Sequence, residues 1–308
     1  MLIYIARILF KSFLTLFAIV TLVFFATRLS GDAIDYIVTD GLTKESRDLL
    51  IEYYGLNEPL GVQYLRFLGA FADGQFGLSF IERRPVIEIV AERIWPSLQL
   101  LIAGMALTIV LALPMGILAA LHRKSWIGSG IMSFAFFGYA VPDFIFSVFM
   151  VLVFSYALNW LPVVGNGTIW HFIMPVLAFS GSLIASLTRF TRNAMLDVLS
   201  QDYMRTARAK GLREGTVILK HGFRNAWITV LSVIGLQIAT RAAASSVVVE
   251  TIFAWPGMGQ LLVNSAIQRD YPVLQFGVVT VACAVIIINA VVDIAYAYAD
   301  PRIRLREA

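Results

Sequence analysis

The segment YMRTARAKGLREGTVILKHGFRNA, residues 203–226, separates two long apolar stretches of the chain. It is basic and helix-prone, and Gly211 stands between two short runs with helical spacing. Glycine adopts a positive φ at low cost, so the pattern predicts a helix over 203–210, a tight turn at Gly211 and a second helix over 214–221. A loop between membrane spans needs only to be polar. This one therefore indicates a docking element.

Small residues at Ala207, Ala209 and Gly211 would let the first of these two helices pack closely against another surface. Helical spacing places Tyr203, Ala207 and Lys210 on one face, with Thr206 beside them. The alternative is a loop made basic only because positive residues stay on the cytoplasmic side of a membrane. That alternative explains the arginines, but it does not explain the glycine, the small residues or the two-helix pattern.

The composition is that of a polytopic membrane protein. Hydrophobic residues make up 59% of the 308 residues and charged residues only 14%, whereas a soluble domain carries about a quarter. The formal charge of +4 could indicate a nucleic-acid partner, but the positions of the positive residues favour membrane topology instead. The single cysteine, Cys283, excludes an intrachain disulfide, and the three histidines have no carboxylate or thiol at ligand spacing. We expect no metal and no cofactor.

Six segments are long and apolar enough to cross a bilayer, which needs about 20 residues per helix. We expect an all-α protein with six transmembrane helices, of which the fourth is the most diluted by polar and helix-breaking residues. The expected spans are 8–26, 98–121, 131–157, 172–190, 226–249 and 273–297.

Lysine and arginine set the orientation of these spans. Eight of them lie in the loop 189–224 and three in the tail after Asp300, so this side and both termini are expected to be cytoplasmic. The segment 29–97 is then an external insertion, with helices expected over 43–54 and 62–71. Four tryptophans fall near external boundaries, where they are expected as interfacial anchors: Trp95, Trp160, Trp170 and Trp255.

Several motifs carry a resemblance to a known family. The run RTARAKGL at 205–212, followed by His221 and then Arg224-Asn225-Ala226, resembles the "EAA" coupling loop of ATP-binding-cassette importer permeases, and more narrowly the dipeptide/oligopeptide/nickel group. Further segments across the chain resemble the same group. They are YGLNEPL at 54–60, DGQFGLS at 73–79, VVETIFAWPGMG at 248–259, RDYP at 269–272 and DPRIR at 300–304.

The resemblance implies an import mechanism with several partners. An external binding protein delivers a small peptide-like solute, two permeases form the path, and two cytoplasmic ATP-binding subunits drive alternating access. This chain resembles the first permease of the pair, and its Phe190-Thr191-Arg192 is similar to glutathione-import permeases. The resemblance implies a subunit in a bacterial inner membrane. The chain contains no Gly-x-x-x-x-Gly-Lys-Ser/Thr phosphate loop, so it is expected to be non-catalytic, with ATP hydrolysed by partner subunits.

The resemblance also implies a type I ABC importer permease fold, the organisation of the chain and its contact residues. Residues 1–28 hold the first span, 29–97 the periplasmic insertion and 98–308 the permease core, with a coupling loop at 191–225. The residues that it assigns to ATPase coupling are Tyr203, Arg205, Thr206, Ala207, Arg208, Ala209, Lys210, Gly211, His221, Arg224 and Asn225. Two features depart from the family pattern: the glutamate that names the motif is missing, and Thr229 stands where proline is common.

Two charges lie inside the expected spans. Asp143 falls about 13 residues into the third span and Arg241 about 15 into the fifth, so at about 1.5 Å per residue both lie at similar depth. A lone arginine there costs about 2.5–3.5 kcal/mol. We therefore predict that the two side chains approach each other or share the translocation path. Arg241 then binds a peptide carboxylate, forms a structural pair or snorkels toward the membrane surface. Pro142 is expected to kink the third helix, freeing carbonyls that line the path.

Other functions remain open at this point. A stand-alone secondary transporter would be expected to show related halves or more carboxylates inside the membrane. An intramembrane enzyme would need a signature such as His-Glu-x-x-His, which the sequence lacks. Within the same importer architecture, a nickel chelate or an oligosaccharide could replace the peptide, because selection rests mostly on the separate binding protein.

Overall fold

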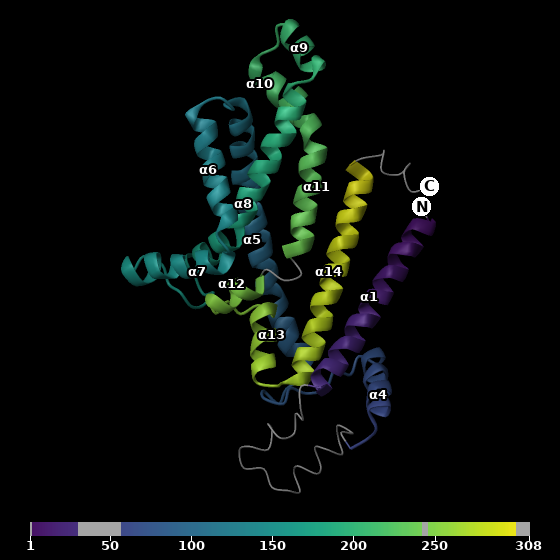
Figure 1. Cartoon of the computed structure of the whole chain (residues 1–308). Helices are drawn as coiled ribbons and strands as arrows, with labels where there is room; N and C mark the ends of the chain where they lie inside the picture. The colour runs from purple at the N-terminus through teal and green to yellow at the C-terminus, as the bar shows by residue number, and fades with distance from the viewer. Residues whose placement is uncertain (1, 30–56, 242–245, 300–308) are drawn as a thin grey trace. The chain divides into compact units, whose positions relative to one another are not determined.

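The computed structural model describes residues 2–29, 57–241 and 246–299, and the regular structure in these ranges is helical (Figure 1). The chain divides into two compact units, Met1–Pro96 with Gly257–Ile286 and Ser97–Pro256 with Ile287–Ala308. The helices are α1 (Leu2–Leu29), α4 (Leu60–Ala72), α5 (Val86–Leu121), α6 (Trp126–Ala140), α7 (Asp143–Met150), η1 (Val151–Ala157), α8 (Ile169–Leu199), α9 (Asp202–Ala209), α10 (Glu214–Thr216), η2 (Val217–Phe223), α11 (Arg224–Thr240), α12 (Ser246–Ile252), α13 (Met258–Ile267) and α14 (Tyr271–Ala299).

Four helices in the described residues are long and apolar enough to cross a membrane. They lie at Phe10–Leu29, Val86–Leu121, Ile169–Leu199 and Tyr271–Val292. A fifth candidate is a broken one, formed by Trp126–Ala140 and Asp143–Ala157 with a bend of 100°. The predicted fifth span, 226–249, corresponds to α11, which has 17 residues, and α12. Residues 242–245 between them lie outside the described part.

The prediction of one kinked helix over 131–157 is wrong, because the chain forms two helices there. α6 ends at Ala140, and its cap Val141 has φ −84° and ψ 119°. Proline disfavours the helical conformation in the residue before it and has no N–H to continue the ladder. Pro142 then caps α7, which leaves in a new direction. Pro142 does bend this span, as expected, but the bend of 100° divides it into separate helices and is not a kink within one helix.

Other boundaries differ less. The helix expected over 62–71 is confirmed as α4, which begins directly after Pro59. The second span begins at Val86, 12 residues before the predicted start at 98, and α8 continues past residue 190 to Leu199. The helix expected over 43–54 lies outside the described residues.

In the unit Ser97–Pro256, α8 is the central helix, and α6, α7 and α11 pack against it. Two glycines of α5 allow the close approach of α8. A Cβ on Gly104 would lie 2.3 Å from the Phe179 ring, and one on Gly116 would lie 2.5 Å from Cβ of Thr191. Small residues permit such contacts between membrane helices.

Trp255 belongs to the core of this same unit. Its side chain is fully buried, and its ring lies 4.6 Å from that of Phe172 at an angle of 78°. The expectation that Trp255 is an interfacial anchor is therefore wrong. The other three expected anchors, Trp95, Trp160 and Trp170, are exposed.

The other unit joins α1, α4, α13 and the first part of α14. The rings of Phe76 and Phe276 stack with centroids 3.9 Å apart. Asp270 is buried and accepts hydrogen bonds from the Ser79 hydroxyl and from the Phe80 amide. This carboxylate ties the turn before α5 to the start of α14.

Candidate functional site

The basic segment forms an elbow of two helices, here called the α9–α10 elbow (residues 202–223). Figure 1 shows it at one end of α8 and α11. α9 ends at Ala209, and Gly211 has φ +73°, as expected for a tight glycine turn. The predicted helix–turn–helix is confirmed. The second helix, however, does not end at residue 221: α10 runs through the π-helical η2 directly into α11.

The inner face of α9 holds the elbow against its own chain. Met204 and Ala207 are buried and form a small cluster with Val217. A Cβ on Gly222 would lie 3.4 Å from the Met204 side chain. Ala207, which the resemblance assigns to the coupling contact, is thus only 5% exposed and packs inside the elbow.

The outer face of the elbow is open. Arg205 is 80% exposed, and its nearest ion-pair partner is Asp202 of the same helix, at 3.6 Å. His221 is half-buried, and its carbonyl accepts a hydrogen bond of 2.6 Å from the Asn225 side chain. The other exposed residues from the coupling set are Tyr203, Thr206, Arg208, Ala209, Lys210, Gly211, Arg224 and Asn225.

An ion pair closes the elbow across the glycine turn. Arg208 Nη2 lies 2.9 Å from Glu214 Oε1, and Arg208 Nε lies 3.2 Å from both carboxylate oxygens. These hydrogen bonds lower the pKa of Glu214 and raise the pKa of Arg208. Sequence reasoning placed Arg208 on the docking surface and did not identify Glu214. The available signal was an opposite charge six residues further on, across a turn.

A second candidate site lies in the unit Ser97–Pro256. Arg241 caps the end of α11, and Asp143 is the first residue of α7. Arg241 Nη1 donates to Asp143 Oδ2 over 2.6 Å. The predicted approach of these two side chains is confirmed. Their side chains are 10% and 24% exposed, respectively.

Ser182 of α8 completes this group. Its hydroxyl donates to Asp143 Oδ1 over 2.7 Å and accepts a hydrogen bond from Arg241 Nη2. The guanidinium also lies over the Phe179 ring, 5.5 Å from its centroid. Side chains of α7 and α8 therefore surround one arginine of α11, Asp143 neutralises its charge, and the amino end of α7 favours the negative charge of Asp143. Sequence reasoning missed Ser182, because serine is common in apolar helices and nothing in its spacing relates it to Arg241.

Gln237 lies one helical turn before Arg241 on the same face of α11. It is 8% exposed, and neither its amide nitrogen nor its amide oxygen has a hydrogen-bond partner within the described ranges. Buried amides are normally satisfied. The hydrogen-bonding groups of the Gln237 side chain are thus left unsatisfied by the described part of the chain in this conformation.

The comparisons with known proteins agree with this architecture. Residues 112–305 match the family described as "Binding-protein-dependent transport system inner membrane component". The chain is 41% identical over 293 residues to the glutathione transport system permease protein GsiC of Shigella flexneri serotype 5b, covering 95% of each chain. It is 42% identical over 284 residues to the oligopeptide transport system permease protein AppB of Bacillus subtilis, covering 89% of this chain and 90% of that protein.

A solved structure resembles the fold. An inward-facing form of the MetNI methionine ABC transporter aligns with a TM-score of 0.58 at 15% sequence identity, covering 70% of this chain and 97% of the other. The permease-like fold therefore persists at low sequence identity.

Proposed function

This chain belongs to the family of binding-protein-dependent transport system inner membrane components, and on that premise we propose that it is a permease subunit that imports small peptides or glutathione. The observation that carries the proposal is the similarity, over 95% of the chain, to a permease named for glutathione, together with that to one named for oligopeptides. The family supplies a non-catalytic membrane subunit. Its energy comes from ATP hydrolysed by other chains.

In the proposed topology the chain crosses the inner membrane six times, with both termini and the α9–α10 elbow in the cytoplasm. α6 with α7, and α11 with α12, supply the third and fifth crossings. Residues 1–28 contain the first span, 29–97 the periplasmic insertion and 98–308 the permease core with its coupling loop at 191–225. The concentration of lysine and arginine in 189–224 supports this orientation.

The proposed partners are two cytoplasmic ATP-binding subunits, a second, paralogous permease and a periplasmic binding protein. The outer face of the α9–α10 elbow is the surface that docks on one ATPase. Two observations support this role: the elbow is exposed, and the Arg208–Glu214 pair makes it a closed unit. Because helix continues from Glu214 to Thr240, a displacement of the elbow is transmitted along a helical segment about 40 Å long. Arg241 lies at the far end of that segment.

The proposed path includes Pro142, Asp143 and Arg241. In this conformation Asp143 neutralises Arg241, so a cargo carboxylate could bind Arg241 only by taking the place of Asp143. The path role thus predicts that the pair opens during transport, whereas a purely structural pair would stay closed.

The deciding experiment is reconstitution in proteoliposomes with the paralogous permease, the two ATPases and the binding protein. We expect uptake of radiolabelled glutathione or alanyl-phenylalanine only when both ATP and the binding protein are present. Uptake by this chain alone would identify a secondary transporter. Uptake of a nickel chelate or an oligosaccharide in place of peptides would keep the permease and replace its cargo.

A further inference from the structure

One face of α8 carries a line of polar side chains. Ser182, Ser186, Arg189 and Asn193 recur at intervals of four, three and four residues, which is the repeat of a single helix face. The first three are half-buried and Asn193 is exposed. Since Ser182 contacts both Arg241 and Asp143, this polar face begins at the ion pair and runs toward the end of α8 that carries the α9–α10 elbow.

Arg189 is the charged member of this face and differs from Arg241 in its surroundings. Its guanidinium lies 4.8 Å from the Tyr139 ring centroid and 5.7 Å from that of Phe190. Over the described ranges, no hydrogen bond or ion pair engages it. Arg189 stands at the cytoplasmic end of the expected span 172–190, where a long basic side chain can reach both water and an anion. Arg189 thus has two aromatic contacts and no anionic partner in the described part of the chain.

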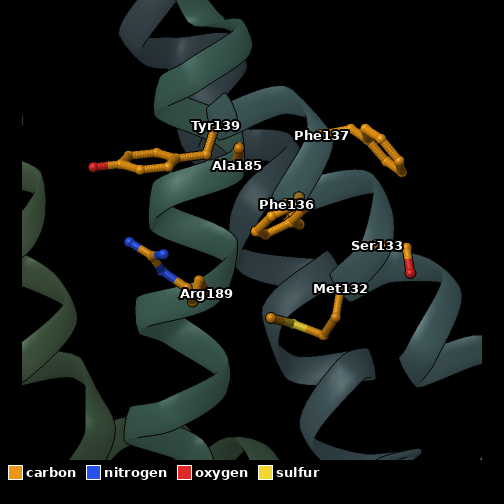
Figure 2. A pocket seen from close by; sticks show the side chains of 8 residues that line it. Met132, Ser133, Phe136, Phe137, Tyr139, Ala185 and Arg189 are labelled. Atoms are coloured by element: carbon orange, nitrogen blue, oxygen red, sulfur yellow. The ribbon is translucent and has the colours of Figure 1, made fainter. Parts of the chain in front are cut away.

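A pocket of about 350 Å³ adjoins this guanidinium. Arg189 is its charged residue, and side chains of α6, including Met132, Phe136 and Tyr139, form an apolar and aromatic wall. Figure 2 shows Arg189 and Tyr139 projecting on the same side of their helices. Phe136 and Tyr139 are exposed, so this is an open hollow and not an enclosed cavity, and its single cation fits a small anion that carries an apolar group.

We propose that Arg189 is a second station for cargo, which binds the carboxylate of a small peptide while the α6 wall holds its apolar side chain. The inference rests on the proposed import of peptides. Arg189 lies seven residues, or roughly 10 Å, along α8 from Ser182. Cargo released from the level of Arg241 therefore meets a second cation on the cytoplasmic side. The polar face of α8 joins the two positions, whereas the α6 side of the hollow is apolar and exposed, so the comparison of nanodiscs below distinguishes cargo from lipid.

The test is equilibrium dialysis on the assembled transporter, with both permeases and the ATPases in nanodiscs and without the binding protein. The probes are radiolabelled alanyl-phenylalanine and its carboxy-terminal amide. We expect Arg189→Gln to weaken binding of the free acid about tenfold, the size of a lost bond to a charged group. Binding of the amide should change by less than about twofold, since it lacks the carboxylate that the lost bond engaged.

Matched variants separate binding from folding. Arg189→Lys should retain most of the free-acid binding, and Tyr139→Phe should behave as wild type, whereas Tyr139→Leu should weaken it. Arg123→Gln, in the exposed loop between α5 and α6, is the control for loss of one positive charge and should have no effect. Equal binding of the free acid to wild type and Arg189→Gln, or no saturable binding to wild type, overturns the inference.

A lipid phosphate has related anionic chemistry, so the dialysis is repeated in nanodiscs with and without phosphatidylglycerol. If Arg189→Gln lowers the phosphatidylglycerol that remains with the purified complex but leaves peptide binding unchanged, the site belongs to lipid and the cargo station is wrong. The same preparations are tested for ATP-dependent uptake with the binding protein. If wild type shows uptake and Arg189→Gln binds peptide as wild type does, the second cargo-binding site is rejected but the proposed function stands. If wild type takes up no peptide, the proposed function itself is rejected.

Discussion

Arg241 and Asp143 are joined by a 2.6 Å hydrogen bond, although 98 residues separate them in the chain. The bond connects the end of α11 to the beginning of α7, and α11 is continuous with the helix that leaves the α9–α10 elbow. The exposed α9–α10 elbow and the charged pair thus lie at the two ends of one helical segment. Under the proposed function, this connection would carry motion from the docked ATPase to the proposed path.

Removing one member of the pair should be more harmful than removing both. Arg241→Leu leaves Asp143 without its cation in a mostly buried position, which costs about 3 kcal/mol. We expect a lower yield of folded protein in a fluorescence size-exclusion assay. The double variant Asp143→Asn with Arg241→Gln should recover the yield. If the recovered double variant then transports peptides normally, the pair is structural and has no role in the path.

The turn at Gly211 should be required for binding of the ATPase. Its φ of +73° is accessible to glycine, whereas proline is restricted to a φ near −65°. Gly211→Pro should therefore abolish co-purification of the ATPase while the chain still inserts into the membrane. Gly215→Ala is the matched control, because nothing lies within 4 Å of its added Cβ and its φ is not positive. If the Gly211→Pro variant still co-purifies with the ATPase, the elbow does not form the docking surface.

The Arg208–Glu214 pair should make the elbow sensitive to acid. The hydrogen bonds from Arg208 lower the pKa of Glu214 below its usual value of 4.5. A carboxylate with a depressed pKa stabilises the folded state above its unfolded pKa, and this contribution is lost as the pH falls through the folded pKa. Hydrogen exchange in α9, corrected for intrinsic rates, should accelerate below about pH 4.5.

The expected size of this acid effect is less than about 1 kcal/mol, because both side chains are substantially exposed. Glu214→Gln should show faster exchange at neutral pH and no further acceleration in acid. An identical pH profile in wild type and Glu214→Gln would assign the effect to another group.

Close packing of α5 on α8 should tolerate no side chain at Gly116. Its added Cβ would lie 2.5 Å from Thr191 Cβ and 2.8 Å from the Thr188 carbonyl oxygen, which is backbone and cannot move aside easily. Gly116→Ala should lower the free energy of unfolding by about 1–3 kcal/mol, the range for overpacked cores, and should therefore lower the melting temperature. Gly130→Ala, with nothing within 4 Å, is the control and should be neutral. An unchanged melting temperature for Gly116→Ala would mean that the two helices can separate locally without loss.

Much of this architecture follows from local patterns in the chain. Apolar length marks the membrane helices, and the glycine between two helical runs predicts the elbow at Gly211. Equal depth in two spans was enough to predict the approach of Asp143 and Arg241. These features are readable because each depends on a repeat, a length or a residue with unusual backbone freedom.

The tertiary structure alone decided the rest. It bent the third span by 100° at Pro142, buried Trp255 against Phe172, and placed Ser182 between the two charges. It also turned Ala207 inward and joined Glu214 to Arg208. Sequence patterns indicate which face of a helix is polar, but the partner of a side chain depends on where another helix crosses. That crossing is set by the shapes of many packed side chains together, which no single segment of the sequence records.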